Sequence, residues 1–363
     1  MKRRISTIAL VLALLMLMSA CAVPAVLDEN KNTPANLKEG NNYNADMENM
    51  NNAQSAGRIW PWEDPSITLP AFTGSVTEPG TIKSLKVLAL GDASSKDSMQ
   101  FLYKLAAEAG ITDVKIAVLY RNSGGSLEGQ WNDFNNNNAA YTYYEDMGEG
   151  WVSTPNAKAQ DVLKSEKWDF VIVHQNLSLH PDKGTYSALS SFTTAINNIL
   201  CNGSGDNANK NPDAKLVWMQ VWAYEINNRN NLYNHTKYYQ NPETKAYDQM
   251  LMYTTAVETI KSLVATDKNI DGIIPVGTAI QNMREAYWSD GMTKDAEFLS
   301  NTGKVAAAVA MFKYLTGYDI NGMELSDSAF DHARPHLNVI KESANNAYLH
   351  PYEVTVSVYD IAE

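Results

Sequence analysis

Residues 84 to 97 read SLKVLALGDASSKD, a short apolar run followed by a turn and a group of small polar residues. An apolar run of this length, closed by Gly91 and Asp92, predicts a buried strand. Four further runs have the same character, and longer stretches with helical spacing separate them. The five strands are expected at residues 86–90, 114–120, 169–174, 215–222 and 272–276, and the helices at 97–109, 157–164, 186–200, 245–265, 278–287 and 302–315.

Strands that alternate with helices in this way predict an α/β fold. We expect a three-layer α/β/α sandwich with a central parallel sheet of about five strands, spanning residues 82–318. Ligands of such folds gather at the carboxyl ends of the strands. Residues 319–363 form a C-terminal extension, and its alternating run EVTVSV at 353–358 predicts a short added strand.

The N-terminus has the features of an export signal. Three basic residues at 2–4 precede an apolar run at 8–18 that is too short to span a bilayer. The run ends in small residues before Cys21, which resembles a bacterial lipoprotein signal and implies lipidation of that cysteine. We therefore expect a signal peptide at 1–20, an Asn- and Pro-rich tether at 21–81, and an extracytoplasmic, membrane-anchored protein; an ordinary signal peptide or a retained anchor is the alternative.

Composition excludes several classes of protein. The chain of 363 residues is 44% hydrophobic and 19% charged, which is too apolar for a disordered chain. Two cysteines cannot provide a disulfide framework. The formal net charge of -12 repels phosphate backbones, so no nucleic-acid partner is expected.

Polar and small residues follow each predicted strand, in five blocks. After the strands come GDASS (91–95), the stretch 122–133 with Gly125, then His174 and Gln175, then WAYE (222–225), and GTAIQNMR (277–284). A sixth block, KDAEFLSNTG, stands at 294–303. These blocks, with WDFVIVHQ (168–175) and DQMLMY (248–253), resemble the SGNH (GDSL-like) hydrolase superfamily, and within it the branch called domain of unknown function 4886.

This resemblance implies a flavodoxin-like fold and a serine esterase mechanism. In the family pattern a serine follows Gly-Asp, and an Asp-x-x-His segment precedes the late helix. Here Ala93 stands at the serine position, and the late segment runs from Asp295 to Phe298. A methyl group and a phenyl ring can neither attack an acyl carbon nor accept its proton, so the resemblance implies a degenerate ester hydrolase of the carbohydrate-esterase type. Asp92 and Asp295 are the carboxylates of the catalytic pattern that remain. Asp295 is expected to cap the start of a helix or to serve as a hydrogen-bonding residue.

Catalysis could also have moved within the site. Ser94 and Ser95 lie one and two positions beyond the expected nucleophile, and His174 ends the third strand. A serine–base pair could form from these residues, because triads are defined by geometry and not by chain order. The alternative is that the serines cap the helix that follows and that His174 is a neutral loop histidine.

The remaining candidates concern ligand binding. Gly125 and Gln175 match family positions that donate to an oxyanion. Aromatic, amide and guanidinium groups suit sugars, and the candidates are Trp222, Tyr224, Gln281 and Arg284, with His174. The tryptophans could instead fill the core. No cofactor is expected. No metal is expected either, because Pro335 disrupts the helical geometry that would bring His332 and His336 of the DHARPH string to one face.

Three functions follow from these observations. The first is a lipid-anchored pseudoenzyme that binds a carbohydrate or acylated glycan. The second is an active serine esterase or deacetylase on glycans, with Ser94 or Ser95 as displaced nucleophile. The third is a structural surface lipoprotein.

Overall fold

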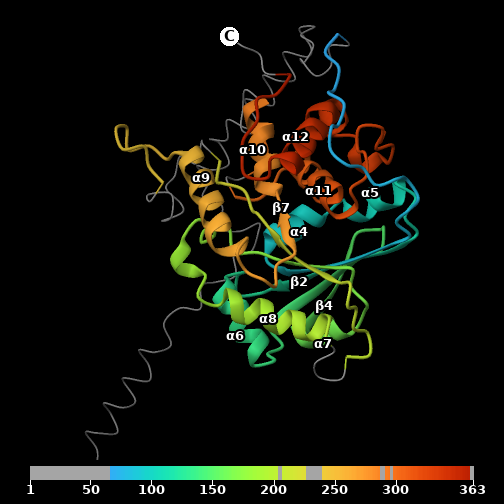
Figure 1. Ribbon diagram of the computed structural model, residues 1–363, viewed down its shortest axis with the longest axis vertical. Helices are drawn as coiled ribbons and strands as arrows, with labels where there is room; N and C mark the ends of the chain where they lie inside the picture. The colour runs from blue at the N-terminus through green and yellow to red at the C-terminus, as the bar shows by residue number, and fades with distance from the viewer. Residues whose placement is uncertain (1–65, 203–206, 226–238, 287–290, 295–296, 360–363) are drawn as a thin grey trace, which may run out of the picture. The chain divides into compact units, whose positions relative to one another are not determined.

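The computed structural model describes residues 66–202, 207–225, 239–286, 291–294 and 297–359 (Figure 1). Its centre is a seven-stranded sheet with the strand order β4-β3-β2-β1-β5-β6-β7. The strands are β1 (Ser84–Gly91), β2 (Asp113–Arg121), β3 (Tyr141–Asp146), β4 (Trp151–Ala157), β5 (Phe170–Val173), β6 (Lys215–Met219) and β7 (Gly272–Ile274). The predicted α/β class is confirmed.

The sheet is mixed, which corrects the expectation of a purely parallel sheet. The neighbours from β2 through β1, β5 and β6 to β7 pair in parallel. Two strands that the sequence analysis did not predict, β3 and β4, add an antiparallel hairpin at the β2 edge. β4 has no apolar run that would predict a strand, because it lies at the edge of the sheet with five of its seven side chains exposed.

Helices pack on both faces of the sheet. The α-helices are α4 (Ala93–Met99), α5 (Leu102–Glu108), α6 (Leu127–Asn135), α7 (Ala159–Lys164), α8 (Leu189–Leu200), α9 (Gln249–Thr259), α10 (Val276–Ala286), α11 (Asn301–Thr316) and α12 (Leu337–Leu349). A π-helical turn, Ile260–Val264, extends α9. The 3₁₀ turns are Lys183–Thr185, Ser328–Phe330 and Arg334–His336.

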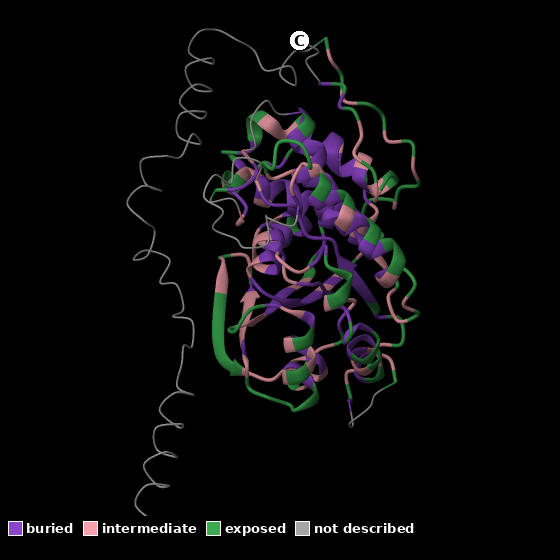
Figure 2. Ribbon diagram, turned by 90° about the vertical axis from the view of Figure 1, so that its left-hand side faces the viewer, coloured by how far each residue is buried: buried purple, intermediate pink, exposed green. Residues whose placement is uncertain are grey.

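The side chains of the strands alternate between these two helical faces. Leu88 and Leu90 of β1 belong to a core that includes residues of α6, α7 and α8. On the other face, α4 and α5 contact β2, and α10, α11 and α12 pack on one another. In Figure 2 the buried residues run through the sheet and the adjoining helices, while β4 is mostly exposed. The sheet therefore provides a rigid platform whose carboxyl edge positions the loops.

The first helix begins earlier than expected. α4 starts at Ala93 and not at residue 97, because Asp92 caps it by accepting a hydrogen bond from the amide of Ser94. The helical segment is broken near Gln100 and continues as α5. The two serines of the turn consequently lie inside the first turn of a helix.

The C-terminal extension contains a helix in place of the expected strand. α12 packs against α10 and α11, and residues 353–358 form no strand. Side chains of helices satisfy this segment's backbone: Asn282 accepts from the amide of Thr355, and Glu342 accepts from the amide of Val358. The described residues include no helix with the length and apolar character needed to cross a membrane.

Candidate functional site

The carboxyl ends of β1 and β5 bring Gly91 and His174 side by side. The two strands pair in parallel with Leu90 opposite Val173, so the next residue of each strand meets at the sheet edge. Space between them is tight: a Cβ atom on Gly91 would lie 2.5 Å from Ser95 Oγ and closer still to His174 Nε2. Glycine is required at residue 91 because the side chains of Ser95 and His174 approach its backbone closely.

Ser95 and His174 form a hydrogen-bonded pair. Ser95 Oγ lies 2.6 Å from His174 Nε2, and His174 Nδ1 lies 2.9 Å from the carbonyl oxygen of Gln175. Because a carbonyl only accepts, Nδ1 carries the proton and Nε2 accepts from the serine hydroxyl. Both side chains have an exposed fraction of 0%. The pair has the polarity of a nucleophile and its base, but it has no exposed surface.

Asp92, which is 7% exposed, lies beside this pair. Its Oδ1 accepts from the amide of Ser94 at 3.0 Å and lies 3.9 Å from His174 Nε2. Its Oδ2 accepts from the side-chain amide of Asn176 at 2.8 Å. Gly125 lies against the same carboxylate, since a Cβ there would come within 2.5 Å of Oδ2. Asp92 and Asn176 thus present a fixed carboxylate and amide at the sheet edge.

Ala93, the position that the sequence resemblance compares with a serine nucleophile, is more open than its neighbours. Ala93 is half-buried, whereas its neighbours Ser94 and Ser95 are buried. The hydroxyl groups are therefore turned away from the position that a nucleophile would use. Ser94 exposes 6% of its surface and, with its amide, completes the cap at Asp92.

The late block lies beside the same helix. One turn after Ala93, Asp97 accepts from the amide of Leu299 at 3.0 Å and pairs with Lys304 at 3.0 Å. Burial raises the pKa of Asp97, against the opposing effect of Lys304. Phe298, next to Leu299, is half-buried and lies 5.7 Å from Lys294 Nζ, measured to its ring centroid. The segment that carries Phe298 thus adjoins the helix that begins at Ala93.

Gln175 is held by hydrogen bonds to three neighbouring segments. Its Oε1 accepts from the amides of Leu127 and Asn176, both at 2.9 Å. Its side-chain nitrogen donates to the carbonyl oxygen and to the hydroxyl of Thr185, at 3.0 Å each. The polar atoms of Gln175 thus join β5 to α6 and to the loop that follows, and its role toward a ligand stays a prediction.

The predicted aromatic and cationic ligand residues are interior residues. Trp222 and Tyr224 expose 1% and 0% of their surface, and Arg284 exposes 7%. Trp222 donates to the carbonyl of Glu297 at 2.7 Å, and Arg284 donates to the carbonyl of Ala223 at 3.0 Å. Gln281 is 2% exposed and donates to Gln249. All four residues are thus buried rather than placed on an exposed rim, and Trp222 packs in the core, as the alternative for the tryptophans described.

Two predicted residues, Asp295 and Cys21, lie outside the described residues. The DHARPH string forms a 3₁₀ turn, and burial lowers the pKa of His336 to about 4. Within the described part of the chain, no group of three or more metal-ligating side chains is brought together.

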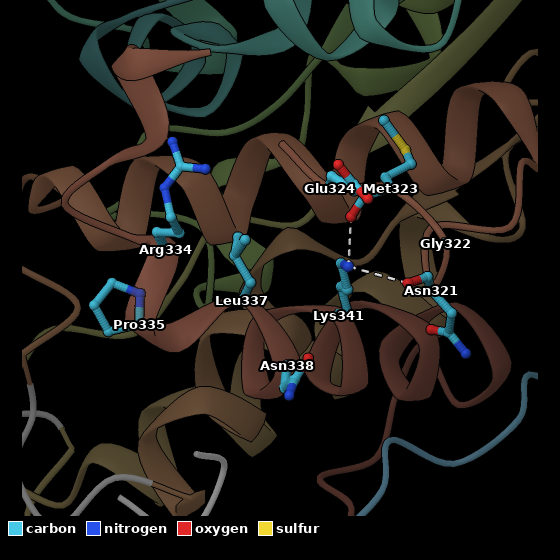
Figure 3. A pocket seen from close by; sticks show the side chains of 9 residues that line it. All are labelled: Asn321, Gly322, Met323, Glu324, Arg334, Pro335, Leu337, Asn338 and Lys341. Carbon is cyan, nitrogen blue, oxygen red and sulfur yellow. Dashed lines mark hydrogen bonds between the residues drawn. The ribbon is translucent and has the colours of Figure 1, made fainter. Parts of the chain in front are cut away.

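A separate hollow lies within the C-terminal extension (Figure 3). It has a volume of about 550 Å³, and all its lining residues fall between Asn321 and Lys341. The buried Lys341 donates to the carbonyls of Asn321 and Met323, at 3.0 and 2.5 Å. Its ammonium group therefore ties together the turn that follows α11, and none of the predicted site residues lines this hollow.

Sequence reasoning missed two parts of the site. One is Gln130, which is fully buried and donates to the carbonyls of Gly125 and His174 at 2.7 and 3.1 Å. The other is a half-buried aromatic row on the missed hairpin. The tyrosines within 141–144, followed by glycines at 148 and 150, are a sequence signal for this hairpin. In the structure both glycines have positive φ.

The comparisons with known proteins agree on one family. The model of the family described as "Domain of unknown function (DUF4886)" matches residues 86–346. A solved DUF4886 family protein from Bacteroides uniformis is similar with a TM-score of 0.64 and 29% sequence identity, over 75% of this chain and 97% of that one. No curated protein shows significant similarity to the chain.

Proposed function

Because the chain belongs to the DUF4886 family, we propose that it is a degenerate SGNH-type ester hydrolase that binds a carbohydrate or acylated glycan without hydrolysing it. The proposal includes the three-layer α/β/α arrangement of that superfamily around the parallel strands. Its site is the surface at the carboxyl ends of β1 and β5.

One observation carries the loss of catalysis. The half-buried position at the start of α4 holds the methyl group of Ala93. The serine and histidine beside it, Ser95 and His174, are wholly buried and are hydrogen-bonded to each other. Acyl transfer requires the nucleophile to reach a substrate carbon with its base in place. A methyl group at the accessible position cannot supply that chemistry.

Polar groups at the same edge support ligand binding. The Asp92 carboxylate and the Asn176 amide are held by each other, and Asn176 is half-buried. A carboxylate accepts from sugar hydroxyls, and an amide both donates and accepts. Groups fixed before binding lose little conformational entropy when a ligand arrives.

The test combines a chemical probe with a binding measurement on the purified full-length chain. A serine-directed fluorophosphonate should not label the protein, and p-nitrophenyl acetate should not be hydrolysed above background. A panel of plant and host glycans, with and without acyl groups, should contain members that raise the melting temperature, because a ligand that binds the native state stabilises it. Labelling or turnover contradicts the loss of catalysis, and the absence of any shift favours a structural surface lipoprotein.

A second candidate is a glycan esterase or deacetylase with Ser95 as nucleophile. The specific observation in its favour is the 2.6 Å separation of Ser95 Oγ and His174 Nε2. It requires the start of α4 to open, because Ser95 is fully buried. Fluorophosphonate labelling that disappears in Ser95→Ala and persists in Ser94→Ala would establish it.

We also propose that the protein is a lipid-anchored, extracytoplasmic protein of the bacterial cell envelope. The basic residues 2–4, the apolar run and Cys21 support this location. Its membrane contact would be two acyl chains on Cys21, and no cofactor is needed for the proposed binding. Mass spectrometry of the N-terminal peptide should find a diacylated Cys21, and a Cys21→Ser chain should leave the membrane fraction.

A further inference from the structure

Three half-buried aromatic side chains form a row on one face of the sheet. Tyr120 of β2, Tyr144 of β3 and Trp151 of β4 lie on adjacent strands. The ring centroids of Tyr120 and Tyr144 are 6.0 Å apart, and those of Tyr144 and Trp151 are 6.4 Å apart. The row crosses the hairpin from the edge of the sheet toward its centre.

This row begins at the candidate site. Tyr120 pairs with Gly91 in the parallel register of β1 and β2, so the first ring lies one strand away from the turn that holds Asp92 and Ala93. Gly91 is the same residue whose lack of a side chain admits the Ser95–His174 pair. The row therefore continues the site along the sheet.

A second row runs beside the first, on helix α4. Ala93, Lys96 and Gln100 are half-buried, and the helix buries Ser94, Ser95, Ser98 and Met99. Lys96 Nζ lies 4.2 Å from the ring centroid of Tyr144, and Gln100 Oε1 accepts from the indole of Trp151 at 3.2 Å. The two rows are thus joined at two points beyond Ala93. We call their six residues, Ala93, Lys96, Gln100, Tyr120, Tyr144 and Trp151, the aromatic strip.

We propose that the aromatic strip is a subsite for a neutral oligosaccharide that extends from the turn at Ala93 to the edge strand β4. The inference rests on the proposed function and names its ligand class. Pyranose rings present apolar C–H faces and peripheral hydroxyls, and the strip offers aromatic surface together with ammonium and amide groups. The rings meet edge to face, at 76° and 80°, and they stand on three adjacent strands. A sugar chain of several residues can therefore contact more than one of them.

Two observations favour a neutral glycan over other occupants. The chain carries a formal net charge of -12, which disfavours polyanionic glycans, and the one cation of the strip is already held over Tyr144. A peptide added as a strand to the edge would meet Pro155 within β4, which weakens a ladder of main-chain hydrogen bonds. Stacking on the strip itself needs no free strand edge.

The experiment compares chain lengths on the full-length protein. Calorimetry is performed with matched disaccharides and hexasaccharides of xylose, mannose and N-acetylglucosamine. In the wild type, the hexasaccharide that binds should do so more tightly than its disaccharide. Trp151→Ala and Tyr144→Ala should each lower the affinity for the hexasaccharide by about tenfold, which corresponds to about 1.4 kcal/mol. The affinity for the disaccharide should change little.

The matched control is Val152→Ala, one residue along β4. Val152 is 62% exposed, and strand alternation places it on the opposite face from Trp151. It should bind like the wild type. Trp151→Phe keeps an aromatic face without the indole hydrogen bond, so retained affinity would also show that the fold is intact.

The outcomes separate the two proposals. If the wild type binds no oligosaccharide of any length, the proposed function fails, and the strip with it. If it binds, but Trp151→Ala and Tyr144→Ala retain full hexasaccharide affinity, or if both chain lengths bind equally well, the strip is overturned and the proposed function stands. Preferential binding of a sulfated hexasaccharide would overturn the neutral class.

Discussion

Ser95 Oγ donates its hydrogen bond to His174 Nε2 across 2.6 Å, and the two residues are joined only because β1 and β5 are neighbours in the sheet. Neither side chain has exposed surface. In a buried setting the bond satisfies an imidazole nitrogen that water cannot reach. The pair therefore stabilises the turn whose half-buried position, Ala93, has no hydroxyl.

Removing the hydroxyl should cost stability. Ser95→Ala leaves Nε2 of His174 buried without a donor, and the expected loss in the free energy of unfolding is about 1 to 3 kcal/mol. Urea denaturation at neutral pH measures it. Ser94→Ala, on the same helix turn, is the control and should lose less than about 1 kcal/mol, because its cap uses the backbone amide and not the hydroxyl. Equal losses in the two variants would refute the assigned role of the Ser95–His174 bond.

The sequence predicts the fold where the strands are buried, and it predicts the candidate site only in part. The apolar runs located β1, β2, β5, β6 and β7 to within a few residues. The edge hairpin was missed because its exposed side chains follow no apolar pattern. Ser95 and His174 were named as a possible pair, but the two residues are 79 positions apart, and their contact depends on the register between β1 and β5, which no local pattern encodes. Burial of Trp222 and Tyr224 was likewise decided by tertiary packing.

A methyl group at Gly91 should disrupt the same turn. The new Cβ would overlap His174 Nε2 and lie 2.5 Å from Ser95 Oγ, so the buried imidazole and its hydrogen bond to Ser95 must be displaced. Gly91→Ala should lower the free energy of unfolding by about 2 to 3 kcal/mol. Gly322→Ala is the matched control, since a Cβ there meets nothing within 4 Å, and it should change stability by less than about 0.5 kcal/mol. A Gly91→Ala protein as stable as the wild type would show that the turn is more open than described.

Stability should fall in mild acid because of His180. This histidine is 2% exposed, and its Nδ1 lies 2.8 Å from the carbonyl of Leu177. Burial lowers the pKa of His180 to about 4, from an ordinary value of 6.5. Between these values the unfolded chain binds the proton and the native chain does not, so stability is lost as the pH falls.

From pH 7 to pH 5 the expected loss due to His180 is about 2 kcal/mol. Denaturation curves across this range measure it, with His180→Gln as the comparison. The variant should have a smaller pH dependence, although His336, whose pKa burial also lowers to about 4, retains part of it. An unchanged slope in His180→Gln would exclude His180 as the cause.

If the proposed function is right, placing a serine at residue 93 and a histidine at residue 298 should create an esterase. In Ala93→Ser with Phe298→His, a hydroxyl would occupy the half-buried start of α4, and an imidazole would stand on the segment that Asp97 fixes to that helix through Leu299. A nucleophile without a base, or a base without a nucleophile, leaves only residual catalysis, so the gain should require both substitutions. Hydrolysis of p-nitrophenyl acetate should exceed that of the wild type by about tenfold or more. The two single variants serve as controls and should stay at the wild-type level. A folded double variant without added turnover would mean that the site has lost more than its serine and histidine, and the proposed descent from an ester hydrolase would lose its chemical support.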